Sequence, residues 1–426
     1  MSRYKSYPEY KDSGVEWIGE VPAHWEVVSL RRHATYQNSN VDKKSNEGEE
    51  PVRLCNYTDV YYNEFINSDG SYMEATASRE EIARFRLRVN DVVITKDSED
   101  PEDIAVPALI THSQDDFVCG YHLTIIRSGD DAAQRFLHRL FDSLAARSYF
   151  FQECPGVTRF GLNQNAIGAF TYGLPPKEEM RQITIFLNRE TTRIDTLVEK
   201  KQRFIELLEE KRQAVITHAV TKGLDPNVPM KDSGVEWIGA VPAHWEVVKC
   251  FHAGVQIYTG RVDVNIQSPN GVYPFFTCGR EIKHTDQYSF DCEAILVAGN
   301  GEVGYTHYYK GKFEAYQRVY VLTNLSEFNP QFLVYYFKAN LMRALESKAV
   351  GSVIQFITLG DLRHFRIAHP DQHAQSQIAA FLDRETARID SLVDKTRQSI
   401  ELLKERRSAL ITAAVTGKID VREEAA

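Results

Sequence analysis

The chain has 426 residues and a net charge of −9, with 43% of its residues apolar and 26% charged. This length exceeds that of one ordinary domain, and the composition is typical of a soluble globular protein. Without a run of about 18 apolar residues or the apolar region of a signal peptide, we expect a cytoplasmic protein with no transmembrane helix. The acidic charge argues mildly against tight DNA binding by this chain alone.

Residues 11–28 and 231–248 repeat one phrase. The first copy reads KDSGVEWIGEVPAHWEVV, and the second differs only by Ala240 in place of Glu20. A shared active motif is one interpretation, but each copy precedes sequence that diverges. Its bulky and turn-forming residues have a spacing that suits packing and a turn: Trp17, Ile18, Val21, Trp25, Gly19 and Pro22. We predict that these two opening segments lead into a pair of domains and dock on long helices.

A second repeat consists of FLNRETTRIDTLV at 186–198 and FLDRETARIDSLV at 381–393. The opening segments lie 220 residues apart and this pair 195 apart, so the second of the two dissimilar blocks is 25 residues shorter. Repetition on this scale indicates duplicated domains. Residues 24–172 carry 15 basic and 23 acidic residues, whereas 244–367 carry 12 and 11.

Both dissimilar blocks have a mixed α/β pattern. Apolar or alternating runs predict strands at 52–62, 91–96, 121–127, 294–299 and 318–323. Helical patterns follow near the end of each block, at 132–152 and 330–347. Because the order of elements matches, we predict the same fold with different surfaces in the two blocks.

Residues 177–222 have the pattern of a long helix that begins after Pro175-Pro176 and stops at Gly223. A seven-residue apolar repeat with polar interruptions predicts a coiled coil between this helix and its duplicate. The predicted core comprises Ile183, Leu187, Ile194, Leu197, Phe204, Leu208, Val215, Ile378, Leu382, Ile389, Leu392, Leu403 and Leu410. Two alternatives are that each helix packs only on its own domain, or that it breaks near Asn188 or Asp383.

No motif predicts catalysis. GNGEVG at 299–304 matches a dinucleotide-binding pattern, but strand-like sequence follows it, which favours a hairpin loop. NPQF at 329–332 resembles part of an amino-methyltransferase motif, but Asn329 and Pro330 suit the start of a helix. The six cysteines lack metal-binding spacing and are expected to be reduced. We therefore expect neither a catalytic centre nor a metal site.

The opening segments, FL[ND]RET-x-RID and the run EKRQAVITHAVTKGLD at 210–225 resemble the specificity subunit of type I restriction-modification systems over nearly the whole chain. The resemblance implies a fold of class α/β (α+β). Two similar mixed α/β target-recognition domains would be separated by two long helices that form an antiparallel coiled coil, with a pseudo-twofold internal repeat. The sequence departs from the family pattern at 369–378, where HPDQHAQSQI has a single proline before the second helix.

The resemblance also implies a non-catalytic DNA-recognition subunit. Each domain would read one half of a bipartite, gapped site in double-stranded DNA, and the helices would set the spacing and recruit two modification (methyltransferase) subunits. Cofactors are not expected in this chain: S-adenosylmethionine, ATP and Mg would bind to the modification subunits and to restriction (translocase/nuclease) subunits. No membrane partner is implied.

The repeats divide the chain into five segments. We expect a first recognition domain at 1–173, a first helical spacer at 174–225, a second recognition domain at 226–368, a second helical spacer at 369–420 and a tail at 421–426.

Candidate DNA contacts are polar residues in loops and at strand ends, because such groups reach base edges and phosphates. The loop at 156–165 and its counterpart at 350–356 are the main candidates. The full set is Lys96, His122, Thr158, Arg159, Asn163, Gln164, Asn300, Gln317, Arg318, Ser352 and Gln355. Alternatively, each of these residues only caps or solvates a loop.

Two other classes of protein stay open on the sequence. One is a catalytic DNA methyltransferase or nuclease with fused recognition domains, although no cofactor or metal motif and little spare sequence support it. The other is a coiled-coil scaffold without a role in DNA binding.

Overall fold

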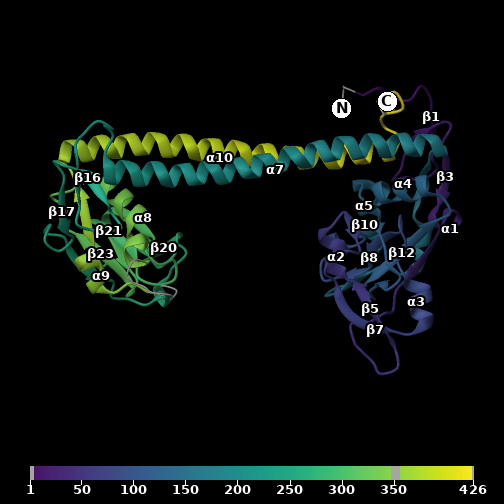
Figure 1. Ribbon diagram of the computed structural model, residues 1–426, viewed down its shortest axis with the longest axis horizontal. Coiled ribbons are helices and arrows are strands. Elements are labelled where there is room, and N and C mark those ends of the chain that lie inside the picture. Colours follow the sequence, from purple (N-terminus) through teal and green to yellow (C-terminus); the bar gives the residue numbers. More distant parts are fainter. Residues whose placement is uncertain (1–3, 347–355, 425–426) are drawn as a thin grey trace. The chain divides into compact units, whose positions relative to one another are not determined.

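The computed structural model describes residues 4–346 and 356–424 (Figure 1). It divides into two compact units, one of residues 1–200 together with 398–426 and one of residues 201–397. Each of the two long helices contributes one part to each unit. Among the described residues, no helix is long and apolar enough to cross a membrane.

The first unit is built on a five-stranded sheet with the order β4-β12-β8-β10-β6. Neighbouring strands are antiparallel, except that β6 is parallel to β10. The strands are β4 Ala34–Asn38, β6 Phe65–Asn67, β8 Val92–Thr95, β10 Pro107–His112 and β12 Leu123–Ser128. A second sheet has the order β11-β5-β7, with β5 Glu50–Cys55, β7 Met73–Ala77 and β11 Phe117–Cys119.

The central strand β8 is buried on both faces, which explains its continuous apolar run. Val92 and Ile94 belong to the core that includes Phe136 of α4 (Asp131–Phe141). Val93 faces the other core, with Phe117 of β11. The alternation of side chains along β8 therefore makes the five-stranded sheet a middle layer between α4 and the second sheet.

The remaining elements of the first unit are short. They are α1 Leu30–His33, α2 Tyr57–Tyr62, α3 Arg79–Phe85, β9 Asp97–Ser98, a 3-10 turn at Pro101–Asp103, α5 Leu144–Glu153, β13 Phe160–Gly161 and α6 Gln164–Ala169.

Two predicted elements of this unit were wrong in extent. The strand expected at 52–62 ends at Cys55, because Asn56 caps α2 and forms a capping box with Asp59. The helix expected at 132–152 is two helices, because Ser143 accepts a hydrogen bond from the Ala146 amide and starts α5 anew.

The second unit has a six-stranded sheet with the order β18-β23-β21-β22-β19-β20. The strands are β18 Gln256–Thr259, β19 Tyr273–Phe276, β20 Ile282–Thr285, β21 Phe290–Ala298, β22 Thr306–Ala315 and β23 Val319–Thr323. A 3-10 turn at Val264–Ile266, α8 Pro330–Glu346 and α9 Leu359–His364 complete the unit. GNGEVG lies in the β21–β22 hairpin connection, and Asn329 caps α8 through bonds from the Gln331 and Phe332 amides, as predicted.

The two units share one topology. The order β18-β23-β21-β22-β19 repeats β4-β12-β8-β10-β6, and β19 is parallel to β22 as β6 is to β10. The prediction of two similar mixed α/β domains is therefore confirmed. The first unit differs by its additional layer of β5, β7 and β11, which its longer block supplies.

Each opening segment pairs with the end of its own domain. It contains β1 Tyr10–Asp12, β2 Glu20–Pro22 and β3 Glu26–Ser29 in the first copy, and β15 Met230–Asp232, β16 Ala240–Pro242 and β17 Glu246–Lys249 in the second. β3 pairs with β14 Thr171–Leu174, and β17 pairs with β24 Arg366–His369. Trp25 and Trp245 are buried against the long helices, so the predicted docking is observed.

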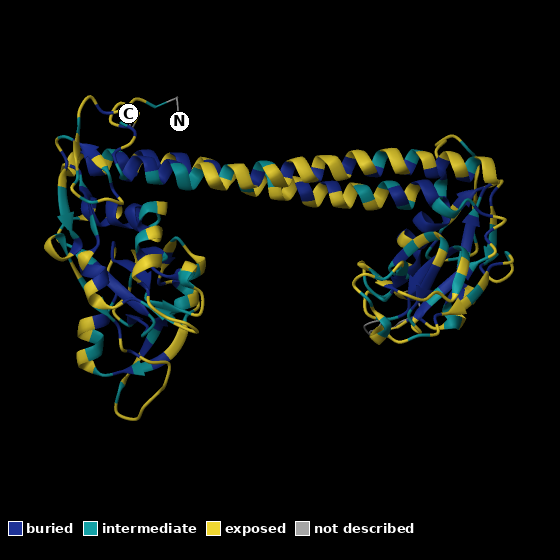
Figure 2. Cartoon of the chain, turned by 180° about the vertical axis from the view of Figure 1, so that it is seen from behind, coloured by how far each residue is buried: buried dark blue, intermediate teal, exposed yellow. Residues whose placement is uncertain are grey.

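The long helices are α7 Lys177–Lys222 and α10 Gln372–Val415, and neither is interrupted at Asn188 or Asp383. In the first unit, Leu187 near the start of α7 shares a core with Ile411 near the end of α10. In the second unit, Ile216 near the end of α7 shares a core with Leu382 near the start of α10. The helices are therefore antiparallel partners in both units. Figure 2 shows the alternation of buried and exposed residues along them.

The seven-residue frame does not hold along the whole of either helix. Leu197, Phe204 and Leu392 are exposed by 42%, 44% and 39%, whereas Ile205 and Val393 beside two of them are buried. A straight helix has about 3.6 residues per turn and drifts by about 20° per heptad from a strict seven-residue repeat. The buried stripe therefore moves to neighbouring positions, and these three residues are corrections to the predicted core.

The other members of the predicted core are buried or half-buried. Buried are Ile183, Leu187, Ile194, Leu208, Ile378, Leu382, Ile389 and Leu410, and half-buried are Val215 and Leu403.

Candidate nucleic-acid interface

In the first unit, predicted DNA-binding residues gather where β8 ends and β12 begins. Lys96 directly follows β8, and His122 directly precedes β12. Because these strands are antiparallel neighbours, the Lys96 amide donates to the His122 carbonyl at 2.9 Å. The loop at 156–165 joins them, because its strand β13 pairs with β9. The sheet thus brings three separate predicted segments together.

Asp97 links the side chains of these segments. Its Oδ1 contacts Nδ1 of His122 and accepts a hydrogen bond from Nη2 of Arg159 at 2.7 Å. Nζ of Lys96 lies 3.6 Å from Oδ2 and donates to the carbonyl of Tyr121 at 2.8 Å. Asp97 therefore holds three predicted DNA contacts in one cluster.

The pKa values define the charges of this cluster. Burial raises the pKa of Asp97, but the hydrogen bond from Arg159 and the charges of His122 and Lys96 outweigh it, so the pKa falls below its usual value. Burial lowers the pKa of His122 despite the nearby carboxylate. At neutral pH, His122 is therefore neutral beside an ionised Asp97, and its Nδ1 lies within hydrogen-bond distance of both Asp97 and Nη2 of Arg159.

The loop at 156–165 presents some of its predicted side chains to solvent and uses one for capping. Thr158 and Gln164 are exposed, and the Arg159 side chain is 60% exposed. The side-chain oxygen of Asn163 accepts a hydrogen bond from the Ala166 amide at 2.8 Å, which caps α6. A Cβ at Gly156 would lie 2.2 Å from the Arg159 carbonyl oxygen, so this tight turn needs glycine.

The second unit places its predicted residues at the equivalent strand ends. The Gly299 amide donates to the Arg318 carbonyl at 2.9 Å, as the Lys96 amide does to His122. This pairing makes Asn300 the counterpart of Asp97. Asn300, Gln317 and Arg318 line one cleft of about 310 Å³. The same fold therefore carries different side chains at matching positions.

Beside the second cleft lies an aromatic residue that the sequence did not single out. Phe356 lines the cleft and is 62% exposed. Ser352 and Gln355, also predicted to contact DNA, lie outside the described residues. Asp97 was missed as well, although it directly follows Lys96 at a strand end that had been singled out.

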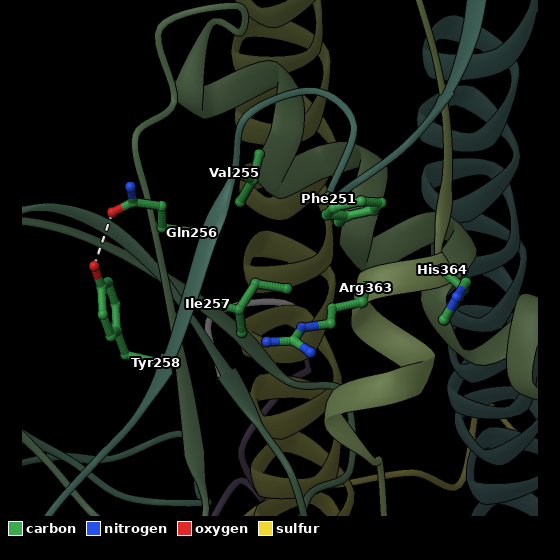
Figure 3. A pocket seen from close by; sticks show the side chains of 7 residues that line it. All are labelled: Phe251, Val255, Gln256, Ile257, Tyr258, Arg363 and His364. Atoms are coloured by element: carbon green, nitrogen blue, oxygen red, sulfur yellow. Dashed lines mark hydrogen bonds between the residues drawn. The ribbon is translucent and has the colours of Figure 1, made fainter.

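Another cavity is separate from these strand ends. It has a volume of about 570 Å³ and lies between the edge strand β18 and helix α9 (Figure 3). Figure 3 shows Arg363 reaching toward Ile257, whereas Gln256 and Tyr258 are joined by a hydrogen bond of 2.8 Å. In the first unit, Tyr36 lies at the corresponding place, against Gly168. None of the predicted DNA-binding residues that the structure describes lines this cavity.

The described parts of the chain hold no cluster of three or more His, Cys, Asp or Glu side chains that could bind a metal ion. All six cysteines are free thiols. Burial raises the pKa of Cys250 to about 12 and also raises that of Cys55, which suits packing rather than nucleophilic chemistry.

Known proteins of one kind match either part or nearly all of this chain. Residues 255–402 match the family described as the type I restriction modification DNA specificity domain. The type I restriction enzyme EcoDI specificity subunit of Escherichia coli is 33% identical over 181 residues, which cover 42% of this chain and 40% of that relative. The putative type I restriction enzyme MjaX specificity subunit of Methanocaldococcus jannaschii is 23% identical over 95% of this chain and 96% of its own.

Two solved structures share the fold. A chain from a study of complex assembly and conformational transition in the type I R-M system superposes with a TM-score of 0.69 at 17% identity, over 93% of this chain and 98% of that one. The HsdS subunit from Thermoanaerobacter tengcongensis superposes with a TM-score of 0.54 at 17% identity, over 94% and 98% of the two chains. With the duplicated sheet, the paired helices and these matches, the chain is similar to type I restriction-modification specificity subunits in sequence and in fold.

Proposed function

We propose that this chain directs a type I restriction-modification complex to its DNA sequence and does not itself catalyse a reaction. Each unit reads one half of a bipartite, gapped site. The observation that supports this most strongly is the pair of equivalent backbone bonds, Lys96 to His122 and Gly299 to Arg318. They put Asp97 and Asn300 at matching places, so one scaffold presents two different chemistries to two half-sites.

The recognition domains in this proposal are residues 1–173 and 226–368, and the helical spacers are residues 174–225 and 369–420. At about 1.5 Å per residue, the 46 residues of α7 make a helix of about 70 Å. One turn of DNA is about 34 Å, so the helical pair has the length to set a gap of one to two turns between half-sites.

The complex around this chain supplies the chemistry. We propose two modification subunits that bind S-adenosylmethionine, and restriction subunits that use ATP and Mg, all acting in the cytoplasm on double-stranded DNA. Residues 24–172 carry 15 basic and 23 acidic residues, so partner subunits also contribute to the positive charge that DNA needs. The DNA contacts on this chain are the exposed candidates, above all Arg159, Gln317 and Arg318.

The test is reconstitution. The purified chain is incubated with DNA and S-adenosylmethionine, with and without modification subunits. Methylation at one gapped sequence only when the modification subunits are present is the expected result. Methylation by this chain alone would instead support the alternative of a fused methyltransferase and would contradict the proposal.

A further inference from the structure

The first unit contains a buried carboxylate with three hydrogen-bond donors. Glu179, on the first turn of α7, is 5% exposed. It accepts hydrogen bonds from Oη of Tyr7 at 2.5 Å, from Nε1 of Trp25 at 2.9 Å and from Nε2 of His24 at 2.7 Å. Burial and the bond to Glu179 raise the pKa of Tyr7, which keeps it a phenol donor. This carboxylate ties the N-terminal segment and the opening segment to α7.

The second unit repeats two of these donors but not the acceptor. His244 and Trp245 repeat His24 and Trp25, because the opening segments match without a gap. The sequences of α7 and α10 also align without a gap in this region. In this alignment, Ala374 occupies the position of Glu179. Asn227 stands at the position of Tyr7. The second unit therefore lacks both the carboxylate and the phenol.

This replacement leaves a pocket and unused donors. A pocket of about 180 Å³ is lined by His244, Trp245, Ala374 and Gln377. Trp245 is 2% exposed and lines the pocket, and within residues 4–346 and 356–424 its indole N–H donates no hydrogen bond to the protein, whereas that of Trp25 donates to Glu179. The N–H is not among the buried polar atoms that lack a partner in the described parts of the chain, so it opens onto the pocket, where an added acceptor can reach it. The second unit therefore lacks the hydrogen-bond acceptor that Glu179 provides in the first unit.

The charges around the pocket leave it nearly neutral. Lys222 donates to the carbonyls of Ile238 and Ala240 at the end of α7, as Lys418 donates to Glu20 in the first unit. Asp225 accepts a hydrogen bond from the Asn227 amide at 2.9 Å. With one cation and one anion beside it, the pocket does not repel a further anion through a large net charge.

We propose that this pocket binds a carboxylate group, whose oxygens take the place of the Glu179 side chain. The acceptor atoms would receive hydrogen bonds from Nε1 of Trp245 and from the His244 ring. The carboxylate belongs either to a small organic acid, for which about 180 Å³ is sufficient, or to an acidic side chain of a partner subunit. The first unit shows the same geometry with an internal ligand.

The experiment uses the full chain labelled with ¹⁵N-tryptophan, which has four indole N–H signals because the chain has four tryptophans. Sodium propionate is the probe, and sodium chloride at equal ionic strength is the control. The Trp245 signal, assigned as the one lost in Trp245→Phe, is expected to move downfield and saturate below about 100 mM propionate. The Trp25 signal should not move, because Glu179 already occupies its site.

Ala374→Glu supplies an internal carboxylate, so this second test does not depend on how tightly the pocket binds propionate. The Trp245 signal of this variant should be shifted without propionate and respond at least tenfold less to it. Ala380→Glu, on the same helix but exposed, is the matched control and should behave as the wild type. An unchanged Trp245 signal in Ala374→Glu, or an undiminished propionate response, would overturn the proposal.

Adding modification subunits in place of propionate identifies the source of the carboxylate. If an acidic side chain of that partner fills the pocket, the Trp245 signal shifts on assembly and Ala374→Glu weakens assembly. If a free acid is the ligand, assembly is unaffected. These measurements use no DNA. A negative result would therefore not contradict the proposed function, and a failure of the proposed function would not change how these measurements are interpreted.

Discussion

The Trp17 ring stacks on Phe170, with ring centroids 5.5 Å apart and planes inclined by 16°. Trp237 stacks on Phe365 in the second unit at the same distance and 7°. Each phenylalanine follows the short helix α6 or α9 and precedes the strand that pairs with the opening segment. In each domain, the repeated segment thus packs the beginning of the domain against its end. This explains why one phrase is written twice around two different domains.

Trp17→Ala and Trp237→Ala should each lower the free energy of unfolding by about 2 kcal/mol, because a half-buried aromatic stack is lost. Denaturant unfolding followed by circular dichroism measures this loss. The preferred DNA sequence of the assembled complex should not change in either variant. A changed recognition sequence would show that the phrase contacts DNA.

Arg159→Ala should weaken binding of the assembled complex to its own site by about 1–3 kcal/mol if the guanidinium reads a base. The effect should be confined to the half-site of the first unit. Fluorescence anisotropy on sites with either half scrambled measures it. Arg79→Ala removes another exposed arginine that pairs with an acid, and serves as the control. Equal losses in both variants would indicate general electrostatics instead of a specific contact.

A second relationship in the first unit joins the recognition domain to α10. Arg407 lies 3.0 Å from Asp195 of α7 and 3.1 Å from Asp142, and it also pairs with Glu64. Arg139, 1% exposed, lies 2.6 Å from the other oxygen of Glu64. Among the described residues of the second unit, only the helix-to-helix part is repeated, as a 3.1 Å contact between Arg212 and Asp390.

Arg407→Met should therefore destabilise the first unit by about 2–4 kcal/mol, because it leaves several carboxylates near each other without their shared cation. Arg212→Met is the matched variant, and it should cost less than about 1 kcal/mol because its ion pair is about half exposed. Thermal unfolding of both variants makes the comparison. Similar losses would contradict the importance given to this network.

His138 makes the first unit sensitive to acid. Burial lowers the pKa of His138 well below its usual value, and the charges of Arg139 and Arg407 lower it further. A neutral buried histidine takes up a proton on unfolding, so its contribution is present above the unfolded pKa of about 6.5 and is lost as the pH falls below it.

Stability should consequently fall by up to about 1.4 kcal/mol per pH unit below pH 6.5, and His138→Gln should flatten that slope. Urea unfolding between pH 5 and 8 measures both proteins. Above about pH 7.5, the two profiles should run parallel. A wild-type slope that persists in His138→Gln would assign the acid sensitivity to other groups.

Much of the fold could be predicted because its signals are local or repeated. The internal repeats located the paired helices, and apolar runs located the central strands of both sheets. The end of β5 could also have been read from Asn56 and Asp59, whose spacing is that of a capping box. The drift that exposes Leu197 depends on the actual twist of α7, which a fixed seven-residue frame does not represent.

The candidate interface was predictable only in part. Lys96, His122 and Arg159 were found separately, as polar residues at strand ends or in a loop. Their common partner Asp97 depends on pairing between β8 and β12 and between β9 and β13. Such long-range pairing leaves no local pattern, and neither does the missing carboxylate at Ala374, which becomes visible only when the two units are compared.

The central claim is that two units with the same fold read two different half-sites. Mapping methylated adenines in DNA modified by the reconstituted complex tests it most directly. The account predicts a bipartite motif with two unlike halves and an unspecified gap, in which exchange of residues 226–368 for those of a related chain replaces one half only. A continuous palindrome, or a motif that changes in both halves after that exchange, would contradict it.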